Sequence, residues 1–131
     1  MMADSALQFE EADFDGLLPA EGCYEAVVER ARFHTSQQGN TTLQVTCEIL
    51  GVPAGHDTVA DYFVLSGSTE RGRAVSRRRL IELYRACGFS PKKGDPIQPG
   101  DLAGCRLEVR LGHETYEGAP RLRVLGYRAL P

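Results

Sequence analysis

The sequence contains no tryptophan, only two lysines, and no basic side chain in its first 29 residues. Without tryptophan, stacking on a flat ligand must rely on tyrosine or phenylalanine. No apolar run approaches the roughly 18 residues of a membrane-spanning helix, so we expect no membrane association. The acidic segment Met1–Ser5 is not followed by the apolar stretch of a secretory signal, so we expect a cytoplasmic protein.

The motifs of the common enzyme classes are missing as well. The chain contains no HExxH, Walker loop or GxSxG segment. Asp57 and Asp61 are four residues apart, which on a strand corresponds to about 13 Å, too far to share a metal ion. The pair His113–Glu114 is the one faint hint of catalysis. We expect no enzymatic activity, no metal ion and no cofactor.

Four cysteines are present without the spacing of a metal site. No two of them form a CxxC or CxH pair, which argues against zinc. Because no secretory signal is predicted, the expected compartment is reducing and disulfides are disfavoured. We interpret all four as small apolar residues in or beside the core, namely Cys23, Cys47, Cys87 and Cys105.

Charge is distributed unevenly along the chain. The formal net charge is −3, yet residues 1–29 hold eight acidic side chains and no base. The other residues carry fifteen bases, thirteen of them arginine, against ten acids. An acidic leader before a basic body is typical of a tail that screens, or competes for, an anion-binding surface. A leader that only keeps the chain soluble is the alternative.

Five segments have the pattern of β-strands. The clearest is 41–50, where Leu43, Val45, Cys47 and Ile49 alternate with polar residues. The remaining strands are predicted over 22–33, 58–65, 102–112 and 121–127. The last two are joined by a predicted hairpin loop over 113–120, around Glu117-Gly118. Residues 1–21 lack a sustained period, so we expect a partly disordered arm before a domain of residues 22–131.

One helix is predicted between the third and fourth strands. Its apolar stripe is Leu80, Leu83, Tyr84 and Cys87, which predicts a helix over about residues 73–87. Ser68 or Thr69 is a candidate N-cap. Gly88 suits a left-handed C-terminal position, with Phe89 folding back on the last turn.

The predicted order β-β-β-α-β-β is that of the OB-fold, a five-stranded, partly open barrel that is all-β apart from one helix. This fold presents the face of its second and third strands, with the first and last hairpin loops, to oligonucleotides. An α+β sandwich shares the order and is the alternative.

Several short motifs add a family resemblance. In their order and spacing, they resemble a family of small bacteriophage and prophage proteins: LPAEGCYEAVV (18–28), SQQGNTTL (36–43), Leu80 and Leu83 with Cys87-Gly88-Phe89, and Tyr116-Glu117-Gly118 followed by Arg121 and Val124. That family is read as OB-fold single-stranded DNA-binding proteins of replication and recombination modules. The resemblance covers about residues 16–128 and implies this fold and function in a bacterial host cell.

Candidate binding residues are cations for phosphates and rings for bases. Residues 71–93 hold eight bases and one acid, although a solvated helix face is the alternative. Because strand neighbours alternate, Phe63 is expected in the core and Tyr62 outside. The same parity places Arg123 with Tyr127, and Arg30 and Arg32 with Tyr24. Thr46 is expected to face outward beside Gln44.

Tyr116, in the last hairpin loop, is the strongest single stacking candidate, with a merely rigid or buried loop tyrosine as the alternative. The full candidate set is Arg30, Arg32, Phe33, Gln44, Thr46, Tyr62, Arg71, Arg73, Arg77, Arg78, Arg106, Arg110, Tyr116, Arg121, Arg123 and Tyr127.

The leading hypothesis is sequence-independent binding of single-stranded DNA in phage or prophage replication or recombination. Arginines would contact phosphates and aromatic rings would stack on bases. A module that recruits a recombinase, polymerase or nuclease, with incidental nucleic-acid contact, is the alternative from another class. An RNA-binding barrel is a third. Phage or host recombination and replication proteins, and a second copy of the chain in a homodimer, stay open as partners.

Overall fold

A computed structural model describes residues 7–14, 17–67 and 69–131. Five antiparallel strands form one open sheet of order β3-β2-β1-β4-β5: β1 (Gly22–Thr35), β2 (Thr41–Ile49), β3 (Thr58–Val64), β4 (Arg106–Tyr116) and β5 (Ala119–Arg128). The helix α2 (Glu70–Ala86) follows β3, and two short 3₁₀ segments are η1 (Glu11–Phe14) and η2 (Pro99–Leu102). The predicted order of β-β-β-α-β-β is confirmed, and the chain is mostly β with one α-helix across its described residues.

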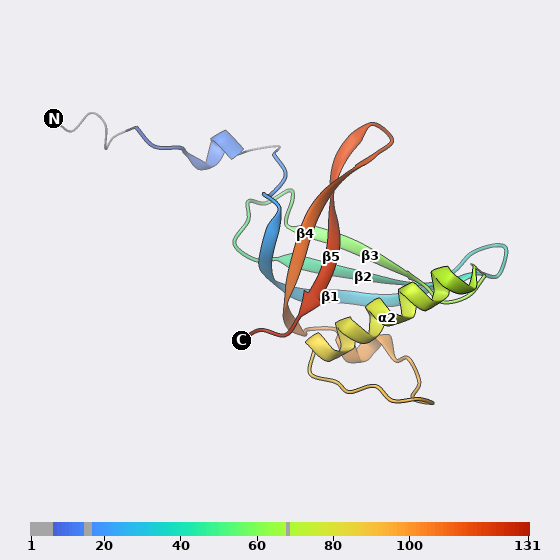
Figure 1. Cartoon of the computed structure of the whole chain (residues 1–131). Helices are drawn as coiled ribbons and strands as arrows, with labels where there is room; N and C mark the ends of the chain where they lie inside the picture. The colour runs from blue at the N-terminus through green and yellow to red at the C-terminus, as the bar shows by residue number, and fades with distance from the viewer. Residues whose placement is uncertain (1–6, 15–16, 68) are drawn as a thin grey trace.

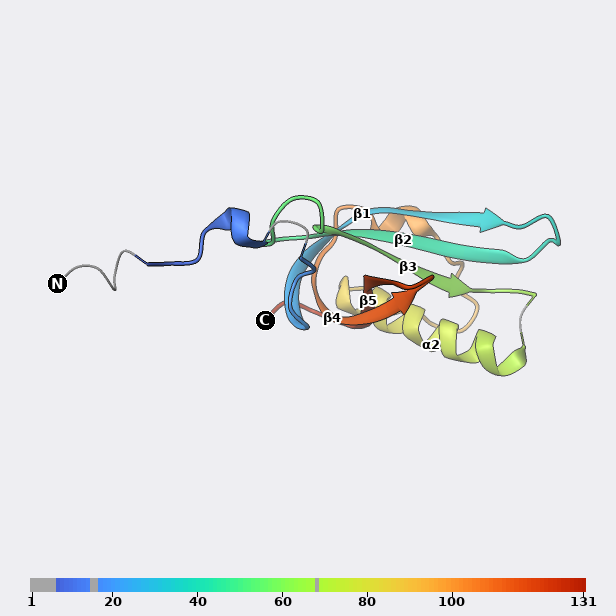
Figure 2. The same ribbon diagram turned by 90° about the horizontal axis from the view of Figure 1, so that it is seen from above.

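The sheet is strongly bent. Figure 1 shows β1, β2 and β3 as one layer, with α2 in front of it and the β4–β5 hairpin rising away from it. Seen from above in Figure 2, α2 and β5 lie on the same side of that layer. Among the residues that the structure describes, no helix is both long enough and apolar enough to cross a bilayer.

The helix begins earlier than predicted. Thr69 is the N-cap, and its hydroxyl accepts a hydrogen bond from the amide of Gly72 at 3.0 Å. This cap holds the first turn, so Gly72 does not delay the start. At the other end Gly88 has a φ of 90°, and the amide of Phe89 donates to the carbonyl of Tyr84 at 3.0 Å. The predicted left-handed C-terminus and the fold-back of Phe89 are therefore confirmed.

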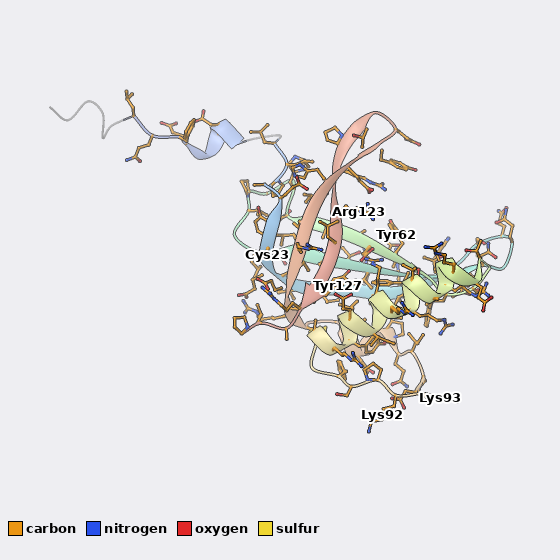
Figure 3. The ribbon with its side chains drawn as sticks, in the orientation of Figure 1. Cys23, Tyr62, Lys92, Lys93, Arg123 and Tyr127 are labelled. Carbon is orange, nitrogen blue, oxygen red and sulfur yellow. A yellow bond between two sulfur atoms is a disulfide. The ribbon has the colours of Figure 1, made fainter. Side chains whose placement is uncertain are left out.

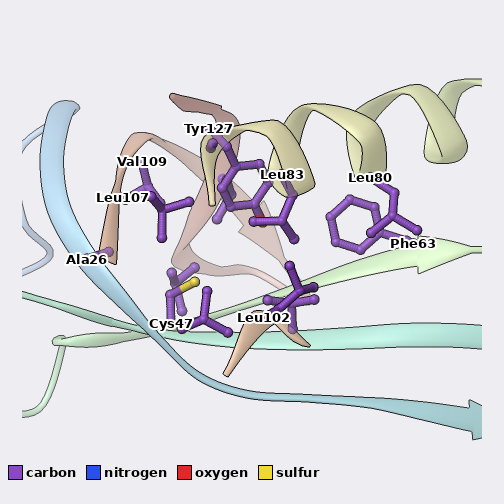
Figure 4. Close-up of a cluster of buried hydrophobic side chains, with 14 of the residues drawn as sticks. Ala26, Cys47, Phe63, Leu80, Leu83, Leu102, Leu107, Val109 and Tyr127 are labelled. Carbon is purple, nitrogen blue, oxygen red and sulfur yellow. The ribbon is translucent and has the colours of Figure 1, made fainter. Parts of the chain in front are cut away.

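The core lies between the β1–β2–β3 layer, α2 and β4–β5, and Figure 4 shows part of it. The alternation predicted for β2 is confirmed, since Leu43, Val45, Cys47 and Ile49 are all buried. Phe63 is fully buried and Tyr62 is exposed, as predicted.

The predicted orientation of Thr46 is wrong. It was expected on the surface but is only 7% exposed, because β2 is the inner strand between β1 and β3 and a short side chain is covered by its neighbours.

Two β-bulges invert the parity of side chains along β1 and β5. The register between β1 and β2 shifts at Glu29, so Arg30 and Arg32 face away from the core, on the opposite face from Tyr24. The register between β4 and β5 shifts at Leu125, so Arg123 is exposed while Tyr127 is buried. Tyr24 was predicted to share a face with the two arginines, and Arg123 with Tyr127. Both predictions are wrong, because an extra residue in each strand reverses the alternation of side chains.

The last hairpin is longer than predicted. Residues 113–116 and 119–120, expected in a loop, belong to β4 and β5, and only Glu117 and Gly118 form the turn. Both turn residues have positive φ, 51° and 80°, as a two-residue primed turn requires. Leu102 was predicted to start the fourth strand but ends η2 as a fully buried residue.

The structure joins Cys87 to Cys105 in a disulfide, which corrects the prediction that cysteines stay reduced. Their Cα atoms lie 5.7 Å apart, because the chain returns from the end of α2 to the start of β4. That separation is within the range of ordinary disulfides. The prediction considered only the compartment, whereas the packing of these two ends brings the sulfur atoms together. Cys23 is exposed and free, and Cys47 is a free buried residue.

Loss of this disulfide should destabilise the protein. The crosslinked residues are 18 apart in sequence, and closing a loop of that size contributes about 3 kcal/mol. We expect the double variant Cys87→Ser, Cys105→Ser to lose about that amount in urea unfolding, and Cys23→Ser to unfold like the wild type. An unchanged unfolding midpoint after reduction of the wild type would contradict the link.

Candidate functional site

The two edge strands of the sheet, β3 and β5, are joined through side chains. The carboxylate of Asp61 on β3 accepts a hydrogen bond from the hydroxyl of Tyr127 on β5 at 2.6 Å. It also forms an ion pair with Arg79 of α2 and accepts from the amide of Tyr62 at 2.9 Å. The ring of Phe63 lies 6.4 Å from that of Tyr127, and the Arg79 guanidinium lies 4.9 Å from the Phe63 centroid. Asp61 thus links three elements at one buried point.

Burial raises the pKa of two groups beside this point. The pKa of Tyr127 is well above its ordinary value, first because the phenol is buried and then because the charge of Asp61 and its hydrogen bond disfavour the phenolate. Burial, followed by the charges of Asp61 and Glu29, raises the pKa of the Cys47 thiol to about 12. Tyr127 is 6% exposed and its hydroxyl donates to Asp61, so its ring has no open face for a base, contrary to the prediction that it is a stacking platform.

An open cleft of about 620 Å³ lies between β3 and β5. Its cationic lining comes from Arg79, Arg121 and Arg123, and Tyr62 contributes an aromatic ring. Figure 3 labels Tyr62 of β3 and Arg123 of β5, which both line this cleft. Arg79 and Arg121 are held in ion pairs with Asp61 and Glu114, whereas Arg123 makes no ion pair with another described residue.

The outer face of the β1–β2–β3 layer carries a cross-strand row that ends at this cleft. Arg32 of β1 pairs with Gln44 of β2, and Gln44 pairs with Tyr62 of β3. Tyr62 is 54% exposed, Arg32 is exposed and Gln44 is half-buried. We call Arg32, Gln44 and Tyr62 the Tyr62 row. Arg30 lies in the next row, opposite the buried Thr46.

The tip of the β4–β5 hairpin holds a second aromatic ring. The guanidinium of Arg121 lies 4.0 Å from the centroid of the Tyr116 ring, and its Nε donates to Glu114 at 2.7 Å. Tyr116 is half exposed, but Arg121 already covers one face of its ring. A base can therefore stack on Tyr116 only on the other face or by displacing Arg121.

The other sequence-predicted residues lie away from the cleft. Arg71, Arg73, Arg77 and Arg78 are on α2, and none of them lines the cleft. Arg77 donates to the carbonyl of Leu65 at 3.3 Å. Two further cations lie on β4: Arg106 pairs with Glu25, and Arg110 lines a smaller cleft of about 300 Å³ with Tyr127. Phe33 lies half exposed near the end of β1.

Of the residues that line the cleft, only Tyr62, Arg121 and Arg123 were candidates from the sequence, and those not predicted include Arg79, His56 and Leu18. Arg79 belongs to the basic run but was not among the candidates. The position of Arg79 in the helix could have identified it. It lies three residues after Ser76 and four before Leu83, on the side of α2 that packs on the sheet. His56 and Leu18 lie in segments without periodicity, so no pattern placed them. Within the described residues, no cluster of His, Cys, Asp or Glu is suited to a metal ion.

Removal of the Asp61 carboxylate should be costly. Asp61→Ala leaves the Tyr127 hydroxyl and the Arg79 guanidinium without their shared acceptor, and we expect a loss of about 3 kcal/mol in urea unfolding. The matched control is Glu108→Ala, which breaks an ion pair with the exposed Arg128 and should cost less than about 1 kcal/mol. Equal losses for the two variants would mean that Asp61 is not a special link.

The raised pKa of Tyr127 predicts a loss of stability at alkaline pH. The folded state holds the phenolic proton more tightly than the unfolded state, so this contribution is complete below about pH 10 and falls as pH rises further. We expect the unfolding free energy of Tyr127→Phe to decrease less than that of the wild type as the pH rises above about 10. Parallel curves, measured by urea unfolding, would contradict the assignment.

Comparison with known proteins places the chain in a family. No curated protein matches it. A family model described as "Protein of unknown function (DUF669)" matches residues 8–119, which include β1 to β4, α2 and the turn that leads into β5. Because this match covers most of the 131 residues, the chain belongs to the DUF669 family of proteins of unknown function.

Proposed function

We propose that the protein has an OB-fold and binds single-stranded DNA across the Tyr62 row and the cleft beside it. The order of elements supports the fold, as does the approach of β3 and β5, whose edges are bridged by Asp61 and Tyr127. In an OB-fold, the second and third strands and the first and last hairpins form the oligonucleotide-binding face. Gln44 and Tyr62 of the Tyr62 row lie on those two strands, and Arg32 lies beside them on β1.

The Tyr62 row carries the proposal, because it combines the two features that single-strand binding requires. Tyr62 presents an exposed ring, and every base has a flat face that can stack on it regardless of sequence. Arg32 at one end of the row and Arg123 across the cleft are exposed arginines without an ion-pair partner among the described residues. They are suited to phosphates, and their guanidinium groups bind two oxygens at once.

The arrangement favours single strands over duplex. Stacking on Tyr62 requires a base whose face is free, and bases in a duplex are already stacked on their neighbours. Gln44 is the one amide in the row, so little of the surface reads base edges. The role in phage or prophage replication or recombination rests on the family resemblance of the sequence motifs.

Binding to a fluorescent poly-dT oligonucleotide at several salt concentrations tests the proposal. For each phosphate neutralised, log K should fall with log salt by a slope of about 0.7, and replacement of Arg32 or Arg123 by Gln should reduce the slope by about that amount. Arg110→Gln, on the other side of β5, is the matched control. Absence of binding at low salt, or equal affinity for duplex DNA, would refute the function, and tighter binding to RNA would redirect it to the RNA alternative.

Truncation of the Tyr62 ring should weaken the complex more than any other single aromatic change. We expect Tyr62→Ala to cost about 1–3 kcal/mol of binding free energy, because one stacked base is lost. Tyr62→Phe keeps the ring and should bind like the wild type. Because Tyr62 is exposed, neither change should alter thermal unfolding. If Tyr62→Ala binds normally while Tyr116→Ala does not, the site is centred on the hairpin tip instead.

A further inference from the structure

The outer face of α2 carries a second basic surface that is separate from the cleft. Arg71, Arg78 and Arg85 are seven residues apart, which is close to two helical turns, so they form one stripe along the helix. All three are exposed, and none forms an ion pair with another described residue. We call these three residues the α2 stripe. At the usual helical rise it is about 21 Å long.

The α2 stripe combines charge with an apolar side chain. Ile81 is 39% exposed and lies next to the stripe, one turn after Arg78 and one turn before Arg85. The helix itself carries two acids, Glu70 directly before Arg71 and Glu82, which lines the smaller cleft toward β5 with its carboxylate near Gly126. Among the described residues, neither acid forms an ion pair with an arginine of the stripe, and the three bases outnumber the two acids of the helix. A basic surface with an apolar centre fits an acidic segment that also carries apolar side chains.

The chain itself contains such a segment. In residues 9–15 (FEEADFD), two phenylalanines alternate with four acids, and no base occurs before Arg30. Phe9 is 86% exposed, and Glu10 and Asp13 are exposed as well. Figures 1 and 2 both show the described N-terminal residues extending away from the body, at the end opposite the start of α2. The described part of the segment, residues 9–14, is therefore placed away from the body of its own chain.

We propose that the acidic segment 9–15 of one copy docks on the α2 stripe of a second copy. The two surfaces differ, so the contact is head-to-tail and can be repeated from copy to copy. The phenylalanines pack on Ile81 while the carboxylates pair with the three arginines. The interaction depends on opposite charges at an exposed surface, so salt weakens it. This proposal does not rest on DNA binding, but on a single strand the same contact would join neighbouring copies and make binding cooperative.

Sedimentation of the full-length protein over a range of concentrations tests the contact. At low salt the mean mass should rise with concentration, and at about 0.5 M salt it should return to that of the monomer. The helix variant Arg71→Glu, Arg78→Glu, Arg85→Glu and the leader variant Glu10→Gln, Glu11→Gln, Asp13→Asn, Asp15→Asn should each associate at least about tenfold more weakly. A control with the same change of charge, Lys92→Glu, Lys93→Glu, Arg110→Glu, should associate like the wild type.

A mixture of the two variants gives the sharpest result. The helix variant keeps an intact acidic segment and the leader variant keeps an intact α2 stripe, so together they should form a one-to-one complex that does not grow further. Circular dichroism checks that each variant is folded. A wild type that stays monomeric at low salt, association that survives either variant, or a mixture that stays monomeric would overturn the proposal.

Discussion

The Asp61 carboxylate is the contact on which the rest of the structure depends. It lies on the edge strand β3, yet it binds the hydroxyl of Tyr127 on the opposite edge and the guanidinium of Arg79 on the helix. A sheet of five antiparallel strands would otherwise leave β3 and β5 as two separate edges. Because Asp61 is mostly buried, its charge is stabilised only while both partners remain in place. The bend of the sheet and the position of α2 are thus coupled at one group.

The same residue helps to explain why the edge of β3 stays open. The amide of Tyr62 donates to Asp61, and the amide of Val64 donates to the hydroxyl of Ser76 on α2. Two backbone donors that would pair with a further strand are therefore occupied by side chains. The space between β3 and β5 remains a cleft, and the ring of Tyr62 stays exposed at its rim. The edge of β3 thus forgoes one row of backbone hydrogen bonds to a further strand. The opening beside it is the surface that we propose for single-stranded DNA.

The regular parts of the fold could be predicted from sequence because they follow simple periods. The alternation of Leu43, Val45 and Cys47 and the stripe of Leu80, Leu83 and Tyr84 place the core correctly. The errors arise where a period is interrupted. The bulges at Glu29 and Leu125 each insert a residue that no sequence pattern predicts. Beyond each bulge, the side chains of the strand lie on the opposite face from the one that alternation predicts. Tyr127 was misplaced for this reason, and the disulfide was missed because it depends on how two distant segments pack.

The same limits apply to the candidate site. Tyr62, Arg32 and Gln44 were each predicted, but only the register of β1, β2 and β3 shows that they form one row. The α2 arginines were grouped with them by charge alone, and the structure separates the two sets. Amide chemical shifts of the labelled protein, titrated with a short dT oligonucleotide, are the decisive test of whether the Tyr62 row binds single-stranded DNA. We expect the largest shifts at Arg32, Gln44, Tyr62 and Arg123, with the signals of Arg71 and Arg78 unmoved. Shifts concentrated on α2, with the Tyr62 row unchanged, would contradict this expectation.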